Sequence, residues 1–157
     1  MRVGILTASD TRTPATDESG KVVQALVETL PGATVVGTYV SADNLECLQA
    51  ELIRMADDLQ CQLILTTGGT GVAPRDVTPE ATMAVCDRLV PGLGEAMRAA
   101  SLAKTPMAMI SRATAGLRGA CLIVNLPGSP KGARECLEAV MPALGHAVEL
   151  ARGDRPH

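Results

Sequence analysis

A chain of 157 residues suits one domain with a substantial buried core, and we expect a single globular domain over residues 1–157. The 14 basic and 17 acidic residues leave a net charge of −3, which argues against a basic surface that follows nucleic acid phosphates. Phe and Trp are absent and Tyr39 is the only aromatic residue, so the chain lacks the stacking platforms that bind single-stranded nucleic acid.

Short aliphatic runs, which are typical of buried strands, alternate along the chain with longer helical patterns. The first strand is expected over residues 3–9, and the polar loop 10–20 that follows it leads into a helix near Asp17. Apolar residues that recur every three or four positions predict another helix within residues 45–59. This alternation predicts an α/β fold in which helices cover both faces of a mainly parallel sheet. Further strands are expected over residues 33–40, 62–67 and 121–127, with a weaker one over 106–111.

The last helix is the most clearly marked element. An apolar stripe at helical spacing runs from residue 133 to residue 151. Ser129 supplies the expected N-cap and Pro130 the first turn, while Pro142 is expected to bend the helix. We interpret this helix as an element of packing and assembly, and His146 within it as a surface or interface group rather than a ligand.

A glycine-rich run directly follows the third expected strand and consists of Gly68, Gly69, Thr70 and Gly71. Bare glycines let backbone N–H groups face an anion, and the next helix, with Thr78 as its expected N-cap and Pro79 in its first turn, adds a favourable dipole. Arg75 adds a positive charge. Because ligands of open α/β sheets bind at the carboxyl ends of strands, we predict an anion-binding site here. The alternative is a tight turn without a ligand.

A second loop of the same kind follows the last expected strand, in the sequence VNLPGSPKG. Gly128 ends a turn that begins at Pro127, and Lys131 can face an anion at the start of the last helix. Pro-Gly is also the ordinary signature of a simple turn. Since both loops follow strands of one parallel sheet, we expect them to border the same crevice.

Ser9 ends the first expected strand, and Asp10 begins the polar loop 10–20 that follows it. A long loop at this position is a usual place for a flap over a ligand. An ordinary surface loop explains the same sequence equally well.

Two carboxylates accompany these loops, although they are far apart in the sequence. Asp76 lies just past the glycine run, and Asp43 follows the second expected strand. Mg²⁺ is commonly held by one or two carboxylates together with substrate phosphates, so the pair predicts a magnesium site. Asp43 with Glu46 also fits a capping box, and this pattern alone favours a cap at Asp43.

The stretches TTGGTGVAPRDVTPEAT, VNLPGSP and TPMAMISRATAGLRG together closely resemble one known family. This is the family of molybdopterin adenylyltransferases of molybdenum cofactor biosynthesis, which includes stand-alone bacterial enzymes and the G domains of gephyrin and its plant counterpart. The resemblance extends from ILTASD to the last helix and so covers nearly the whole chain.

The resemblance implies a three-layer α/β/α fold, a homotrimer and a reaction that depends on Mg²⁺ and ATP. AMP is transferred from ATP to the terminal phosphate of molybdopterin, pyrophosphate is released, and a separate insertase enzyme takes the product. Asp43 and Asp76 match the two essential acids of the family, which reverses the preference for a cap at Asp43. The remaining substrate-binding positions implied by the match, or placed beside it in the predicted crevice, are Ser9, Asp10, Gly68, Gly69, Thr70, Gly71, Arg75, Ser111, Asn125, Pro127 and Gly128.

Other interpretations remain open at this point. A non-catalytic molybdopterin carrier of the same family would keep the glycine loops without the metal-binding acids, and the intact Arg75-Asp76 pair favours the enzyme. The related competence-damage proteins act on nucleotides, but they usually carry a further domain for which 157 residues leave no room. A structural scaffold leaves the glycine run unexplained.

The five cysteines are irregularly spaced and form no CxxC pair, which argues against a zinc site and fits reduced thiols. Met1 leads directly into a strand-like run without the pattern of a signal peptide. No apolar run approaches the ~20 residues that span a bilayer. We therefore expect a cytoplasmic protein with no membrane association.

Overall fold

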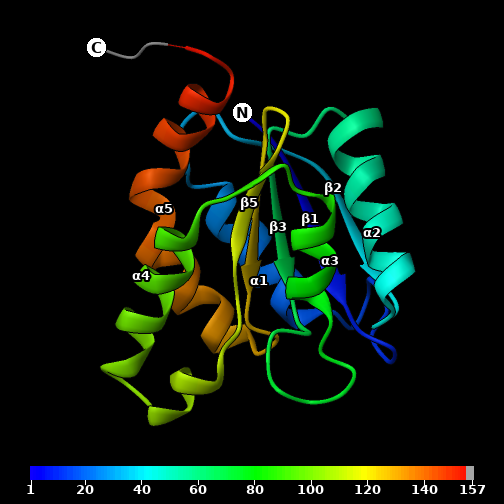
Figure 1. The fold of residues 1–157 in the computed structure, drawn as a ribbon, viewed down its shortest axis with the longest axis vertical. Helices are drawn as coiled ribbons and strands as arrows, with labels where there is room; N and C mark the ends of the chain where they lie inside the picture. Colours follow the sequence, from blue (N-terminus) through cyan, green and yellow to red (C-terminus); the bar gives the residue numbers. More distant parts are fainter. Residues whose placement is uncertain (155–157) are drawn as a thin grey trace.

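The computed structural model describes residues 1–154 and contains a six-stranded sheet that lies between two layers of helices (Figure 1). The strand order is β2-β1-β3-β6-β5-β4. The first four strands in this order are parallel, and the last two run antiparallel to their neighbours. The predicted three-layer α/β/α fold is confirmed. The strand bounds are β1 Arg2–Ala8, β2 Thr34–Ser41, β3 Leu63–Thr67, β4 Arg88–Leu89, β5 Ala115–Arg118 and β6 Cys121–Leu126.

The core is divided between the two faces of the sheet. Alternate residues of β3 point to opposite faces, so Leu63 and Leu65 pack with α1, α4 and α5, while Ile64 packs with α2 and α3. Leucine, isoleucine, valine and methionine fill both halves in the absence of Phe and Trp. The helix bounds are α1 Glu18–Val27, α2 Leu45–Ile53, α3 Thr78–Val85, α4 Pro91–Leu102 and α5 Pro130–Ala151, with a π-helical turn, η1, at Arg54–Asp58 and a 3₁₀ helix, η2, at Pro106–Ile110.

The expected weak strand over residues 106–111 is wrong, because this segment forms η2. Thr105 caps η2 by accepting a hydrogen bond from the backbone N–H of Met107, at 3.2 Å. Pro106 then occupies the first helical position, where its missing N–H costs nothing. The alternation that resembled a strand is instead one buried alanine, Ala108, between exposed methionines.

The long C-terminal helix α5 follows the sequence signals closely. Ser129 accepts a hydrogen bond from the backbone N–H of Gly132 at 3.0 Å, which confirms the predicted N-cap. Pro142 does not end the helix, which continues to Ala151. His146 is exposed on its outer face. Within residues 1–154, no helix combines the length and the apolar character needed to cross a bilayer.

Candidate functional site

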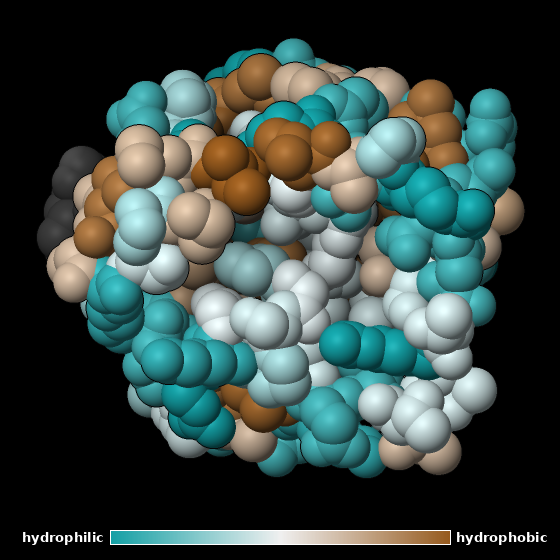
Figure 2. Space-filling model, turned by 90° about the horizontal axis from the view of Figure 1, so that it is seen from below, coloured by the Kyte–Doolittle hydropathy of each residue, from teal (hydrophilic) through white to brown (hydrophobic). Residues whose placement is uncertain are grey.

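The carboxyl ends of the parallel strands meet at one edge of the sheet, at the bottom of Figure 1. The loops after β1, β2, β3 and β6 all emerge there. Figure 2 looks at this edge and shows a hollowed centre with apolar side chains along part of its rim. This is the position at which open α/β sheets bind ligands.

The two glycine loops lie against each other at this edge, as predicted. Gly68 and Gly69 have φ angles of +90° and +65°, a region that favours glycine. A Cβ on Gly68 would lie 2.5 Å from the carbonyl oxygen of Ala8, and one on Gly128 would lie 3.2 Å from the Cα of Gly68. A side chain at Gly68 would therefore push the loop after β3 away from the end of β1, and one at Gly128 would push it away from the loop after β6.

Asp43 does not cap the helix that follows it. The N-cap of α2 is Asn44, whose side chain accepts a hydrogen bond from the backbone N–H of Cys47 at 3.0 Å. The capping interpretation of Asp43 is therefore wrong. Asp43 Oδ1 is instead buried and has no hydrogen-bond partner within residues 1–154. Burial, with the nearby carboxylates of Asp10 and Asp76, raises the pKa of Asp43.

Thr78 shares this condition. The predicted N-cap role of Thr78 is wrong, because α3 begins at Thr78 itself and its Oγ1 is the other buried side-chain oxygen without a partner in the described part of the chain. Both oxygens face Gly69: a Cβ on that residue would collide with Thr78 Oγ1 and lie 3.4 Å from Asp43 Oδ1. An unpaired buried oxygen is costly, so the pair indicates a place where a bound group completes the hydrogen bonding or coordination.

Asp10 and Asp76 flank this place. Asp10 accepts a hydrogen bond from the backbone N–H of Asp43 at 3.0 Å and forms an ion pair with Arg75. Asp76 Oδ2 accepts from the backbone N–H of Ala73 at 3.0 Å, which fixes the carboxylate close to Gly71. The structure therefore brings Asp43 and Asp76 to one loop cluster, although they are far apart in the sequence.

Not every predicted substrate residue faces the open edge. Asn125 is 0% exposed and donates to Thr66 Oγ1 at 3.0 Å and to Thr82 Oγ1 at 2.8 Å. In this structure Asn125 links β6 to β3 and α3, so a direct contact with substrate stays a prediction. Ser9 Oγ similarly accepts from the backbone N–H groups of Thr11 and Arg12, at 3.2 and 3.1 Å.

A cavity of about 270 Å³ adjoins the glycine loops. Its wall includes Ser111 and Pro127, two of the predicted substrate residues, together with Thr70 and Gly71. The rest of the wall is mainly apolar and comes from α4, η2 and α5, for example Met97, Ala108, Ile110 and Cys136. An apolar cavity with a few convergent polar groups is the usual form of a small-molecule site.

A larger cavity of about 660 Å³ lies at the opposite, amino-terminal end of the strands. Its charged residues already have protein partners: Arg118 donates to Asp57 at 3.0 and 2.6 Å, and Asp87 accepts from the backbone N–H of Gly119 at 2.7 Å. Arg2 donates to the carbonyl oxygens of Gln60 and Leu59. No glycine loop and no unpaired buried oxygen of the described residues lies there, so we assign the site to the smaller cavity.

Arg112 is a structural residue of the site that sequence reasoning missed. Its guanidinium donates to the carbonyl oxygens of Gly71 at 2.6 Å and Asp76 at 2.5 Å, and it forms an ion pair with Glu80. Its own backbone N–H donates to the carbonyl oxygen of Thr70 at 2.8 Å. Arg112 thus holds both ends of the loop 71–76. The only sequence signal for Arg112 is its position directly after Ser111 in the stretch TPMAMISRATAGLRG.

A metal ion at this edge would draw on few protein ligands. Among residues 1–154, no group of three or more His, Cys, Asp or Glu side chains is arranged to hold a metal. Two carboxylates with substrate phosphate oxygens are nevertheless a normal environment for Mg²⁺. The unpaired Asp43 Oδ1 fits that arrangement better than it fits a structural role.

Residues 4–146 match the family described as "Probable molybdopterin binding domain". Among characterised relatives, the molybdopterin adenylyltransferase of Helicobacter pylori (strain J99) is 46% identical over 98% of this chain and 89% of its own length. The molybdopterin adenylyltransferase of Escherichia coli (strain K12) is 42% identical over 94% of this chain and 77% of its own length. The crystal structure of the molybdopterin biosynthesis enzyme MoaB from Thermus thermophilus is 49% identical, covers 98% of this chain and 97% of its own, and superposes with a TM-score of 0.89.

Proposed function

The chain belongs to the molybdopterin-binding domain family, and from this premise we propose that it transfers AMP from ATP to the terminal phosphate of molybdopterin, with release of pyrophosphate. Relatives at 46% and 42% identity carry the name molybdopterin adenylyltransferase, which supports an enzyme over a non-catalytic carrier. The observation that carries the proposal is the pair of unpaired buried oxygens, Asp43 Oδ1 and Thr78 Oγ1, beside Gly69. A simple carrier has no need for a desolvated carboxylate at this point.

The reacting groups are proposed to lie along the glycine loop. The pterin occupies the 270 Å³ cavity, where apolar walls cover its ring and Ser111 lies at the polar margin. Its phosphate reaches the loop Gly68–Gly71, where the backbone N–H groups of Gly69, Thr70 and Gly71 act as donors. Pro127 and Gly128 form the opposite border of the phosphate site.

Asp43 and Asp76 are proposed to hold Mg²⁺. When bound, this ion neutralises negative charge on the phosphates of ATP and on the group that is transferred. Asp76 is held in place by the N–H of Ala73, and Arg112 fixes the loop that carries it. Thr78 Oγ1 is available to donate a hydrogen bond to a phosphate oxygen beside Asp43, or to donate to or accept from a water molecule there.

Nucleotidyl transfer of this kind depends on positioning and charge neutralisation more than on a covalent intermediate. The start of the loop that carries the donors is fixed, because Gly68 lies against the backbone of Ala8 and its N–H is bonded to Leu126 O at 3.1 Å. The loops are therefore set before the substrate arrives, and little reorganisation is needed during the reaction.

We also propose a cytoplasmic homotrimer that passes its product to a separate insertase enzyme. The exposed side chains of Leu102, Met107, Met109 and Ile110 leave an apolar surface around η2 that association would cover. All five cysteines are free thiols, which supports a reducing compartment.

The test is direct. The purified chain is incubated with molybdopterin, ATP and Mg²⁺, and adenylyl-molybdopterin and pyrophosphate are measured by mass spectrometry and a coupled assay. Product that depends on all three additions supports the proposal. Tight molybdopterin binding with no product at any Mg²⁺ concentration would replace it with a carrier function.

A further inference from the structure

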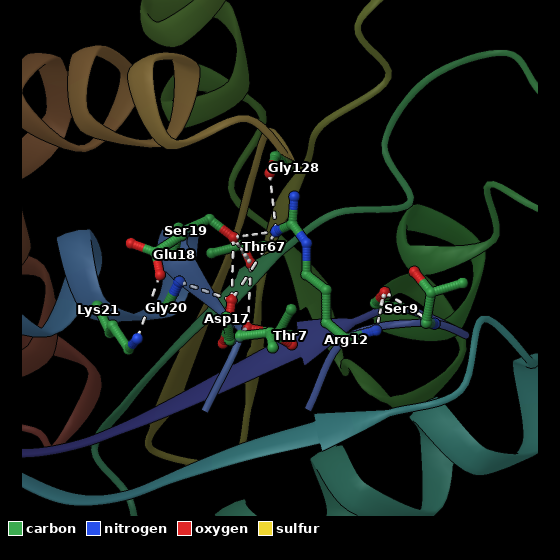
Figure 3. Close-up of polar contacts among 12 residues, drawn as sticks. Thr7, Ser9, Arg12, Asp17, Glu18, Ser19, Gly20, Lys21, Thr67 and Gly128 are labelled. Atoms are coloured by element: carbon green, nitrogen blue, oxygen red, sulfur yellow. Dashed lines mark hydrogen bonds and ion pairs between the residues drawn. The ribbon is translucent and has the colours of Figure 1, made fainter. Parts of the chain in front are cut away.

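A buried polar network lies beneath the loop that follows β1. Asp17, which is 5% exposed, accepts hydrogen bonds from Thr7 Oγ1 at 2.5 Å, from the backbone N–H of Gly20 at 3.0 Å and from Ser19 Oγ at 3.2 Å. Ser19 Oγ also lies 3.2 Å from Thr67 Oγ1 at the end of β3. The network therefore joins the carboxyl ends of β1 and β3 to the first turn of α1 (Figure 3).

Arg12 rests on this network and reaches the second glycine loop. Its Nη1 donates to Ser19 Oγ at 2.7 Å and to the carbonyl oxygen of Gly128 at 3.2 Å, and it lies 3.8 Å from Asp17 Oδ1. Figure 3 shows the guanidinium standing between Ser19 and Gly128. All these contacts use one nitrogen. Within residues 1–154, Nη2 and Nε have no hydrogen-bond partner, and the side chain is 34% exposed.

The other arginines of this edge contact parts of it other than the loop after β6. Arg75 is paired with Asp10, and Arg112 is used by Glu80 and by two carbonyl oxygens of the glycine loop. Arg98 donates to the carbonyl oxygens of Ser111 and Ala113, at 3.4 and 2.7 Å.

The cluster also carries the carboxylates of Asp10, Asp43 and Asp76. Phosphate substrates that arrive beside three carboxylates need a nearby cation with free donors. Among the arginines at this edge, within residues 1–154, Arg12 is the one that hydrogen-bonds to the loop after β6, and its Nη2 and Nε are open.

We propose that Arg12 is a substrate-binding residue that holds a phosphate group at the junction of the two glycine loops, through Nη2 and Nε. The inference rests on the proposed function in that the phosphate belongs to one of its substrates, either the terminal phosphate of molybdopterin or the β- and γ-phosphates of ATP. A guanidinium presents two parallel donors that match two phosphate oxygens. Gly128, whose carbonyl oxygen accepts from Arg12, lies against Gly68 of the phosphate-binding loop.

The buried network makes this arrangement rigid. Asp17 and Ser19 hold Nη1 in the free protein, so much of the ordering that phosphate binding requires is already in place. An arginine fixed in this way loses little side-chain entropy when it binds a ligand. This explains why a charged network is buried under a surface loop.

The experiment compares Arg12→Ala with Lys21→Ala in the full chain. Lys21 anchors the same loop, since its Nζ donates to the carbonyl oxygen of Ala15 at 2.8 Å and to Glu18 at 3.2 Å, but it does not approach the glycine loops. Both variants lose one positive charge and one loop contact. Dissociation constants are measured by isothermal titration for ATP, for pyrophosphate and for molybdopterin, each without the other substrate, and thermal unfolding is followed by circular dichroism.

Arg12→Ala is expected to weaken the binding of at least one of these ligands by about tenfold or more. The dissociation constants of Lys21→Ala should stay within about twofold of those of the parent. A loss confined to ATP and pyrophosphate assigns Arg12 to the nucleotide phosphates, and a loss confined to molybdopterin assigns it to the pterin phosphate. If Arg12→Ala does not fold, Arg12→Gln, which keeps a donor for Gly128 but removes the charge, is used instead.

Unchanged affinity for all three ligands in a folded variant overturns the inference. The parent adenylylation assay keeps this result separate from a failure of the proposed function. A parent that forms no product while Arg12 still determines pyrophosphate affinity contradicts only the enzyme activity.

Discussion

Asp43 Oδ1, from the loop after β2, and Thr78 Oγ1, from the first residue of α3, face the same glycine, and neither has a hydrogen-bond partner among residues 1–154. Buried polar atoms are nearly always paired, so two such atoms beside one backbone position indicate a site that is completed by a ligand. Sites of this kind trade stability for function. The loss of stability in the free protein can be measured at Asp43.

Asp43→Asn is expected to abolish adenylylation and to leave the free protein as stable as the parent or more stable, by up to about 1 kcal/mol at pH 7. The folded state raises the pKa of Asp43 above its ordinary value of 3.8, mainly through burial and the neighbouring Asp10. The folded parent therefore holds this proton more tightly than the unfolded chain does. It loses stability as the pH rises from the ordinary value through the raised pKa. The variant has no such loss.

Urea unfolding of the parent and of Asp43→Asn between pH 3 and pH 8 measures this difference in stability. Asp57→Asn is the matched control, because Arg118 lowers the pKa of Asp57 and the sign is reversed: this variant is expected to lose stability at neutral pH. An Asp43→Asn protein that is clearly less stable than the parent at pH 7 would show that Asp43 supports the fold rather than a ligand.

Asp76→Asn is expected to lower the rate of adenylylation by about 10²–10³-fold, the cost of losing one preorganised electrostatic group. The asparagine oxygen can still accept from the N–H of Ala73, so the loop and the affinity for molybdopterin should change little. Rates and dissociation constants are measured together. Asp87→Asn is the control, since Asp87 also accepts from a backbone N–H, that of Gly119 at 2.7 Å, at the other end of the sheet. Near-normal turnover in Asp76→Asn would leave Asp76 as a loop residue only.

The sequence was sufficient for the parallel core of the fold and for the glycine loops. Buried strands such as β3 and the stripe of α5 are local patterns, and they predict the layers directly. The choice of cap was harder. Asp43 and Asn44 are adjacent acceptors, and Asn44 forms the cap because its backbone is extended, with φ −136° and ψ 132°. These backbone angles cannot be read from a pattern of residue types.

The roles of Arg12 and Arg112 were beyond sequence reasoning for a different reason. Arg12 reaches Gly128, and Arg112 reaches Gly71 and Glu80, so both contacts join segments that are distant in the chain. Such partners are set by the packing of loops at the sheet edge. The antiparallel pair β4 and β5 was missed because its two strands are only two and four residues long, too short for a sequence pattern to mark them.

Glu80→Gln is expected to reduce stability at pH 7 by about 0.5–1 kcal/mol, a small effect because both Glu80 and its partner Arg112 are more than a third exposed. Arg112 holds the pKa of Glu80 below its ordinary value of 4.5. The stability that the ion pair contributes is therefore fully present above pH 4.5 and is lost as the pH falls through the lowered pKa of Glu80. The difference between parent and variant should vanish in strong acid.

Denaturant unfolding at several pH values measures that difference. Glu138→Gln, which breaks an exposed pair with Arg134 at 3.7 Å on α5, is expected to change stability by less than about 0.5 kcal/mol. A difference for Glu80→Gln that persists unchanged at pH 2 would mean that packing, and not the ion pair, is responsible.

Gly69→Ala tests whether the glycine loop binds a ligand or only turns the chain. Gly69 has a φ of +65°, and an added Cβ would fill the space between Thr78 Oγ1 and Asp43 Oδ1. Gly32 has a similar φ of +72° but has no atom within 4 Å of an added Cβ. Gly32→Ala therefore carries the same backbone cost, about 1–2 kcal/mol, without blocking anything.

Gly69→Ala should lose at least as much stability as Gly32→Ala in thermal unfolding, because its Cβ also collides with Thr78 Oγ1. Only Gly69→Ala should lose affinity for molybdopterin or ATP. We expect a loss of about tenfold or more, since the Cβ displaces a bound group from several donors at once. Isothermal titration of the two variants and the parent gives the comparison. Equal affinity in all three proteins would mean that the space beside Asp43 and Thr78 is not used by either substrate, and the two unpaired oxygens would then need another explanation.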